Sequence, residues 1–100
     1  MRIELYIPRK EFKPFKKDYE QKFCGIFNGF TRRKAHGAWK DNQGVVVSEP
    51  VYIYTFLVAD DNEFETAVTY SWAMCFAGQL RTLCNQDCVL VTIGDKPYFV

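Results

Sequence analysis

The sequence predicts an α+β fold whose strands and helices follow in the order β-α-β-β-α-β. Apolar and polar residues alternate from Arg2 to Ile7, which is the period of a half-buried strand. From Pro14 to Phe27 the apolar residues recur every three or four positions, which is the spacing of an amphipathic helix. The segment from Val45 to Val58 is rich in β-branched and aromatic residues, and these residue types favour strands.

Turn-forming residues predict the boundaries in the first half of the chain. Pro8 ends the first strand, and Asn28-Gly29 ends the first helix, because both residue types favour a left-handed turn at a helix C-terminus. The residues from Asp41 to Gly44 have turn-forming chemistry. The strand-like segment from Thr31 to Lys40 and the one from Val45 to Val58 therefore form a hairpin.

Capping residues predict the boundaries in the second half. The residues from Asp60 to Asn62 can cap a second helix, which runs from Glu63 to Cys84 and carries acidic residues near its N-terminus. The polar residues from Asn85 to Asp87 end this helix. The last strand of the predicted order runs from Val89 to Ile93, and Tyr98 to Val100 is a candidate for a short terminal strand after a proline.

This order of elements, with its two β-α-β crossovers, is typical of the ferredoxin-like sandwich. In that fold a four-stranded antiparallel sheet of order 4-1-3-2 carries two helices on one face. The 100 residues are enough for one hydrophobic core. We therefore predict a single ferredoxin-like domain over residues 1–100.

Composition excludes several classes of protein. No apolar run reaches the roughly 18 residues that cross a bilayer, and the first segment lacks the apolar core of a secretion signal. We therefore predict a cytoplasmic protein with no membrane partner and with reduced thiols. Cys84 and Cys88 have no second close cysteine pair beside them, and His36 is the only histidine, so no metal site and no cofactor are predicted.

Charge is unevenly distributed along the chain. Residues 1–40 hold 11 Lys and Arg against 4 Asp and Glu, a balance of 11 − 4 = +7, whereas residues 41–100 hold 2 against 8, a balance of 2 − 8 = −6. Such asymmetry can mark a surface for anions or for self-association. A simple difference in solvation between the two halves explains it equally well.

Two apolar surfaces predict self-association. If Val51, Ile53 and Leu57 point toward the helices, three aromatic residues of the same strand lie on the open side of the sheet. The second helix is apolar around most of its circumference, and large exposed apolar surfaces mark interaction sites. We therefore predict a homodimer or higher oligomer. The predicted interface residues are Tyr52, Tyr54, Phe56, Tyr70 and Trp72.

Aromatic residues on a central strand also occur in RNA recognition motifs, which share this order of elements. The segment from Val51 to Phe56 lacks the basic residue and the glycine of that motif. A nucleic-acid-binding domain is therefore the weaker alternative. It would use the sheet aromatics together with Arg32, Arg33, Lys34 and the Lys-rich first helix as phosphate contacts.

Several short motifs occur along the chain, each of them once and in a fixed order. They are Ile3 to Pro8, Gly29-Phe30-Thr31, Gly37-Ala38-Trp39, Gly44, Glu49, and Asn85 to Val89. In this order they resemble a family of short uncharacterised bacterial, plasmid and phage proteins that share a domain of unknown function. The family usually has Glu where this chain has Asp87. The resemblance implies a ferredoxin-like fold and a mobile-element setting, and it implies no activity and no catalytic residue.

The predicted topology brings polar residues of these motifs to one end of the sheet. The end of the first strand, the hairpin, the start of the third strand and the loop before the fourth strand all lie there. Trp39 can stack a base, while Gln86 and Arg9 can read its polar edges or phosphates. An equally simple interpretation is that the polar residues only hold the hairpin and the loop in place. The predicted ligand-binding residues are Arg9, Trp39, Glu49, Gln86 and Asp87.

These features predict a non-enzymatic, oligomeric binding module. The preferred hypothesis is a phage or plasmid accessory protein that counters host defence, either by sequestering a nucleotide-like small molecule or by blocking a host protein. The other alternative is a small acid–base enzyme that uses Glu49 and Asp87, or His36. No nucleophile elbow, P-loop or metal motif accompanies these residues, which favours binding over catalysis.

Overall fold

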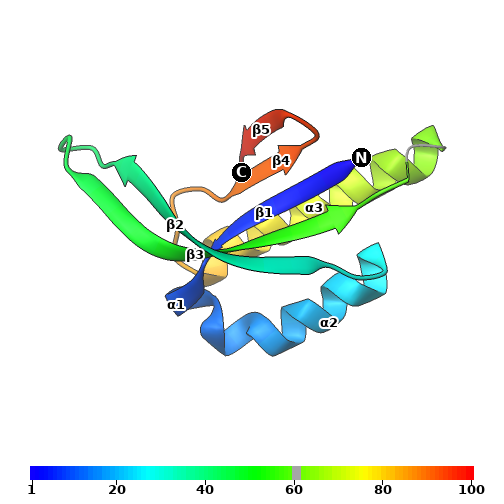
Figure 1. The fold of residues 1–100 in the computed structure, drawn as a ribbon, viewed down its shortest axis with the longest axis horizontal. Helices are drawn as coiled ribbons and strands as arrows, with labels where there is room; N and C mark the ends of the chain where they lie inside the picture. The colour runs from blue at the N-terminus through cyan, green and yellow to red at the C-terminus, as the bar shows by residue number, and fades with distance from the viewer. Residues whose placement is uncertain (60–61) are drawn as a thin grey trace.

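The computed structural model describes residues 1–59 and 62–100, and in them an antiparallel sheet packs against helices on one face (Figure 1). The strands are β1 (Arg2–Pro8), β2 (Thr31–Lys40), β3 (Val46–Leu57), β4 (Leu90–Ile93) and β5 (Lys96–Phe99). The helical elements are α1 (Arg9–Phe12), the 3-10 turn η1 (Lys13–Phe15), α2 (Lys16–Phe27) and α3 (Glu63–Leu83). Within these residues no helix is both long enough and apolar enough to span a membrane.

The strand order is β2-β3-β1-β4-β5, and every neighbouring pair is antiparallel. The first four strands have the predicted 4-1-3-2 order, read from the other edge. The predicted number of four strands is wrong, because Lys96–Phe99 adds β5 to the edge of β4. The hairpin of β2 and β3 extends past the rest of the sheet at its far end (Figure 1).

Local sequence explains where the helices begin and end. The first helical segment starts at Arg9, directly after Pro8, and Pro14 lies in the 3-10 turn that joins α1 to α2. Asn28 ends α2 in the left-handed conformation, at φ 63°, which asparagine tolerates better than most residues. Asn62 caps α3 by accepting a hydrogen bond from the Glu65 backbone. The two aspartates predicted to assist this cap, Asp60 and Asp61, lie outside the described residues.

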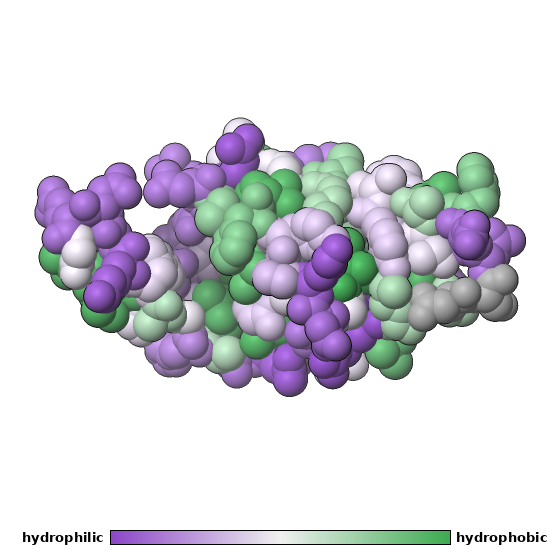
Figure 2. All heavy atoms as spheres, turned by 90° about the horizontal axis from the view of Figure 1, so that it is seen from above, coloured by the Kyte–Doolittle hydropathy of each residue, from purple (hydrophilic) through white to green (hydrophobic). Residues whose placement is uncertain are grey.

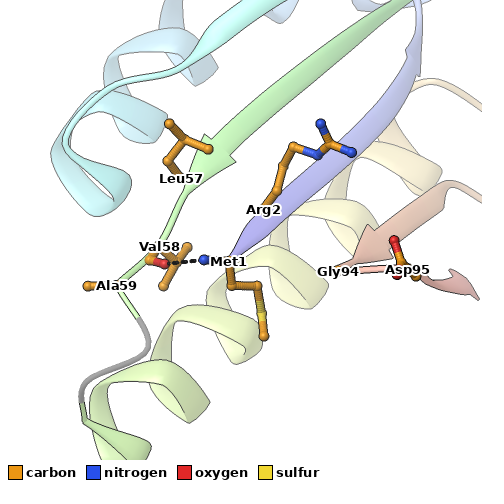
Figure 3. A pocket seen from close by; sticks show the side chains of 7 residues that line it. All are labelled: Met1, Arg2, Leu57, Val58, Ala59, Gly94 and Asp95. Atoms are coloured by element: carbon orange, nitrogen blue, oxygen red, sulfur yellow. Dashed lines mark hydrogen bonds between the residues drawn. The ribbon is translucent and has the colours of Figure 1, made fainter.

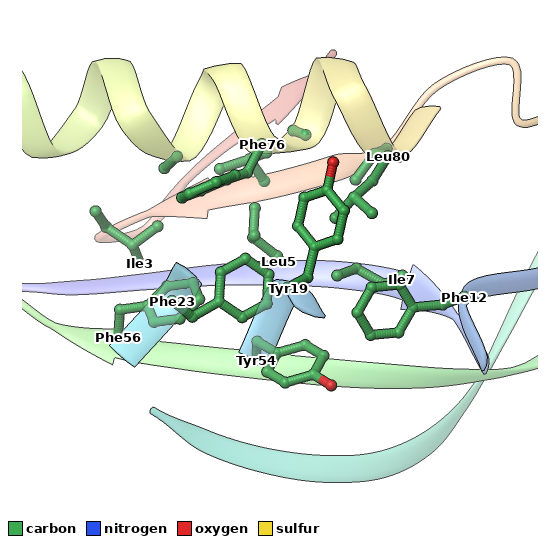
Figure 4. Packing of buried hydrophobic residues seen from close by; sticks show 14 of the residues in the cluster. Ile3, Leu5, Ile7, Phe12, Tyr19, Phe23, Tyr54, Phe56, Phe76 and Leu80 are labelled. Atoms are coloured by element: carbon green, nitrogen blue, oxygen red, sulfur yellow. The ribbon is translucent and has the colours of Figure 1, made fainter. Parts of the chain in front are cut away.

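Aromatic rings fill the core between the sheet and the helices (Figure 4). Phe23 of α2 lies at its centre and is fully buried. Its ring centroid is 5.1 Å from that of Tyr54, 5.2 Å from that of Phe56 and 5.3 Å from that of Phe76 on α3. These edge-to-face contacts join β3, α2 and α3 into one core.

The predicted faces of β3 are wrong. Tyr54 and Phe56 are 0% exposed and point toward the helices, whereas Leu57 is 78% exposed. The strand register explains this, because β1 pairs Leu5 with Tyr54 and Ile3 with Phe56, and paired residues share a face. Tyr54 and Phe56 therefore cannot contribute to the predicted oligomer interface, and neither can form a sheet platform for RNA bases.

Arginine residues on β2 pair with carboxylates. On the helix side of the sheet, the guanidinium of Arg32 forms an ion pair with Glu20 of α2. On the other side, the guanidinium of Arg33 lies 3.0 Å from the buried carboxylate of Glu4 on β1. Burial opposes ionisation of Glu20, but hydrogen bonds from Tyr54 and Arg32 outweigh it and lower the pKa of this carboxyl. Two of the arginines predicted to contact phosphates are thus committed to contacts within the fold.

Candidate functional site

A cavity of about 390 Å³ lies on the open face of the sheet, at the end where β1 stops. The end of β1, the arm of the hairpin, the loop between α3 and β4, and the last strand surround it. Seen from above, the hydrophilic hairpin tip stands apart from the body of the molecule, and a notch separates the two (Figure 2). The lining residues are Tyr6, Pro8, Gly37, Ala38, Trp39, Glu49, Val51, Gln86, Asp87, Cys88, Leu90 and Phe99.

A tight turn holds the hairpin wall of this cavity. The Asp41 carboxylate accepts hydrogen bonds from the backbone of Gln43 at 2.9 Å and of Val45 at 3.0 Å. Gly44 adopts φ 78°, which glycine reaches without strain. The turn sets the register in which Trp39 lies opposite Val47 and Gly37 opposite Glu49. Paired residues share a face, and Val47, the partner of Trp39, is two residues before Glu49 on β3. Trp39 and Glu49 therefore lie on the same side of the hairpin.

The loop between α3 and β4 forms the other wall. The Gln86 backbone donates to the Arg81 carbonyl at 2.9 Å, and its side-chain amide donates to the Cys84 carbonyl at 2.9 Å. Asn85 turns the chain with φ 52°. These contacts use the donor side of the Gln86 amide. Among the described residues no donor contacts its oxygen, which leaves that oxygen to accept a hydrogen bond from a ligand.

Four of the five predicted ligand-binding residues line the cavity: Trp39, Glu49, Gln86 and Asp87. Arg9, the fifth, does not line this cavity, because it lines a different hollow on the helix side of the sheet. After Pro8 the chain turns directly into α1, and this turn carries Arg9 to the opposite face. His36, the third candidate for acid–base chemistry, lies on β2 opposite Pro50 of β3 and is not among the lining residues.

The charged groups around the cavity are acidic. Glu49 and Asp87 line it, and no Lys, Arg or His among the described residues does so. Burial raises the pKa of the Glu49 carboxyl, and repulsion from Glu11 raises it further. The cavity therefore favours neutral or positively charged groups and disfavours phosphates. Within residues 1–59 and 62–100 no three metal-ligating side chains come together.

Sequence reasoning missed the apolar part of the lining. Val51 and Leu90 lie on the same side of the sheet as Tyr6, because β1 pairs with both of their strands. Alternate residues of β3 lie on opposite faces of the sheet, which could have indicated this lining. Both faces of β3 are apolar, however, so the sequence does not show which of them lines the cavity. Phe99 belongs to β5 and reaches the cavity only because this strand joins the sheet.

A second hollow lies at the opposite end of β1 (Figure 3). The N-terminal amino group of Met1 donates to the Val58 carbonyl at 2.8 Å, which ties the start of the chain to the end of β3. Arg2 and Asp95 are its charged lining residues, and none of the predicted ligand-binding residues lines it. Its position places it apart from the candidate site.

No family model matches the sequence, and no curated protein sequence matches it. The fold is similar to a solved structure described as a phage SAM lyase in complex with S-methyl-5′-thioadenosine. The two structures superpose with a TM-score of 0.70 over 99% of this chain and 87% of the other, at 14% sequence identity. At this identity the similarity shows a shared fold.

Proposed function

We propose that the cavity binds a small nucleoside without phosphate groups, of the class to which S-methyl-5′-thioadenosine belongs. The observation that carries this proposal is the set of described residues around one cavity: an exposed tryptophan, an amide with an open acceptor, and two carboxylates with no Lys, Arg or His in the same lining. Its volume of about 390 Å³ lies within the range of small-molecule sites.

Each group matches one part of a nucleoside. The indole of Trp39 is 43% exposed and offers a flat apolar face on which a base can stack. The Gln86 oxygen can accept a hydrogen bond from an exocyclic amino group. Glu49 and Asp87 can accept hydrogen bonds from ribose hydroxyls, and bonds to a charged acceptor are stronger than neutral ones.

The structural neighbour supports this assignment. It is a phage protein of the same fold, and the ligand in its complex is an uncharged thioether of adenosine. Such a molecule meets the electrostatic requirement of the acidic cavity. The resemblance of the sequence motifs to phage and plasmid proteins points in the same direction. Binding without turnover would make the protein a trap for its ligand.

Isothermal titration calorimetry with three ligands tests the proposal. We expect S-methyl-5′-thioadenosine and adenosine to bind, and adenosine monophosphate to bind at least about tenfold more weakly, because Glu49 and Asp87 repel its phosphate. Equal or tighter binding of the phosphorylated ligand would contradict the proposed selectivity. No detectable heat with the thioether at millimolar concentration would reject the nucleoside site.

A second candidate function is favoured by the raised pKa of Glu49, which suits a general base. With S-adenosylmethionine (SAM), the substrate named in the description of the structural neighbour, Glu49 would take a proton from the carbon next to the one that bears sulfur. The released electron pair forms a carbon–carbon double bond, and the carbon–sulfur bond breaks with its electrons remaining on sulfur. The products are S-methyl-5′-thioadenosine and an unsaturated amino acid.

Chromatographic measurement of S-methyl-5′-thioadenosine release across pH tests this candidate. A base must be ionised, so the rate should rise with pH through the raised pKa of Glu49, and Glu49→Gln should lose turnover. Glu11→Gln is the matched control, because removing its charge should lower the pKa of Glu49 and move the rise to lower pH. Turnover that survives in Glu49→Gln would exclude this residue as the base.

Self-association stays a prediction, and the surface that supports it is on α3. Phe64, Val68 and Trp72 recur every four residues, are 77%, 41% and 40% exposed, and form an apolar stripe. An antiparallel pair of α3 helices centred on Trp72 would place Glu63 of one copy near Arg81 of the other. Sedimentation equilibrium that gives a monomer mass at high protein concentration would reject this interface.

A further inference from the structure

A basic groove lies on the helix side of the sheet, between the helical run from α1 to α2 and the edge strand β2. Its volume is about 690 Å³. The sheet separates it from the cavity, because Pro50 and Tyr52 of β3 line the groove whereas Glu49 and Val51 line the cavity. The groove residues are Arg9, Lys10, Lys13, Lys16, Lys17, Lys34, Pro50 and Tyr52.

The charge of the groove is uncompensated over most of its length. Of the described residues that line it, six are Lys or Arg and none is Asp or Glu. Lys16 lies 3.9 Å from Glu20, whose carboxylate already pairs with Arg32. In the part of the chain that the structure describes, the other five cations form no ion pair within the protein. Such a concentration of one sign attracts an anion.

Tyr52 holds part of this charge in place. Its half-buried ring lies 5.8 Å from the Arg9 guanidinium, 6.0 Å from the Lys16 ammonium and 5.4 Å from the Arg32 guanidinium. Cation–π attraction at these distances orders the side chains at the floor of the groove. Because cations surround the ring, it organises charge and does not offer an open face for a base.

The spacing of the cations matches a linear polyanion. Lys10, Lys13 and Lys17 belong to α1, η1 and α2 in turn, so one wall of the groove carries a row of lysines that follow one another along the chain. Lys34 extends from β2 on the opposite wall. A single phosphate group needs donors that converge on one point, whereas this row presents charge along an open groove.

We propose that the basic groove binds the phosphate backbone of single-stranded nucleic acid without reading its sequence. A positively charged groove that follows the backbone is one of the two features by which proteins bind single strands non-specifically, the other being aromatic side chains that stack bases. A duplex is contacted by elements that project into its grooves, and this surface is concave. The site is independent of the nucleoside cavity on the other face of the sheet.

Fluorescence anisotropy with a labelled oligothymidylate, whose bases do not pair, tests the proposal. If about four phosphates are neutralised, raising the salt from about 50 to about 200 mM should weaken binding roughly 50-fold. The double variant Lys13→Glu/Lys17→Glu should weaken binding at least about tenfold and flatten the salt dependence. The control Lys40→Glu/Lys96→Glu makes the same change in net charge on exposed residues outside the groove and should change binding less than about threefold.

Four outcomes would overturn the proposal. The first two are no binding at low salt by wild-type protein and equal losses in the groove variant and its control. The third is equal binding of polyglutamate, which would show a general anion surface, and the fourth is preference for a labelled duplex over the single strand. Circular dichroism shows whether the variants are folded, and titration with S-methyl-5′-thioadenosine shows whether the cavity is intact. A failure of this proposal is thereby distinguished from a failure of the nucleoside site.

Discussion

Replacing Trp39 with alanine is expected to weaken binding of S-methyl-5′-thioadenosine by about tenfold to a hundredfold. Stacking of one base on an aromatic side chain is worth about 1–3 kcal/mol, and each 1.4 kcal/mol is a factor of ten in affinity. Trp39 lines the cavity and is 43% exposed, so the substitution removes a binding surface while the core stays intact. Calorimetric titration of the variant measures the loss directly.

Two further substitutions make this result specific. Trp39→Phe keeps a flat ring and should recover most of the affinity. Val46→Ala is the matched control, because Val46 is 64% exposed on the same hairpin and lies outside the cavity. An affinity that is unchanged in Trp39→Ala, or lost equally in Val46→Ala, would show that no base stacks on this ring.

Replacing Phe23 with alanine is expected to lower the free energy of unfolding by about 3–5 kcal/mol. Phe23 is fully buried, and its ring contacts rings from β3 and α3, so truncation opens a cavity where three elements meet. A domain of this size has about 5–15 kcal/mol of stability in total. Urea denaturation followed by circular dichroism measures the change in the unfolding midpoint.

Phe64→Ala provides the comparison for this core variant. Phe64 has the same chemistry, but it is 77% exposed near the start of α3. Its truncation should change the free energy of unfolding by less than about 0.5 kcal/mol in the monomer. Similar losses in the two variants would mean that the packing around Phe23 does not dominate the stability of the core.

The element order and the sheet order of four strands could be predicted from the sequence, because long periodic segments and clear turns mark them. The fifth strand was harder to predict. It is four residues long, contains Pro97, and follows β4 after a turn at Gly94-Asp95. A segment this short has no measurable periodicity, and only its pairing with β4 makes it a strand.

The faces of β3 show a different limit. Apolar residues occupy both of its sides, so alternation identifies a strand without saying which side faces the helices. Pairing with β1 and the volume of the aromatic rings determine which face of β3 is buried. The buried Tyr54 hydroxyl donates a hydrogen bond of 2.6 Å to the Glu20 carboxylate. A buried tyrosine with a carboxylate partner 34 positions away cannot be recognised from local pattern.

The candidate site was predictable where topology alone decides position. Trp39, Glu49, Gln86 and Asp87 lie on segments that the strand order brings to one end of the sheet, and they do meet there. The location of Arg9 could not be predicted in this way, because it depends on the direction in which the chain leaves β1. The chain turns into α1 at once, and a difference of one residue decides between the two faces of the sheet.

The alternation of β3 between the cavity and the basic groove restricts how the hairpin can change in length. The pairing of β3 with β1 fixes the side on which Val51 lies, so inserting one residue in β3 between Glu49 and Val51 would shift the pleat of the arm and turn Glu49 from the cavity toward the groove. Inserting two residues at this position would keep each side chain on its present face and would only lengthen the hairpin. Relatives of this protein with working sites on both faces should therefore have hairpin strands that differ in length by even numbers of residues.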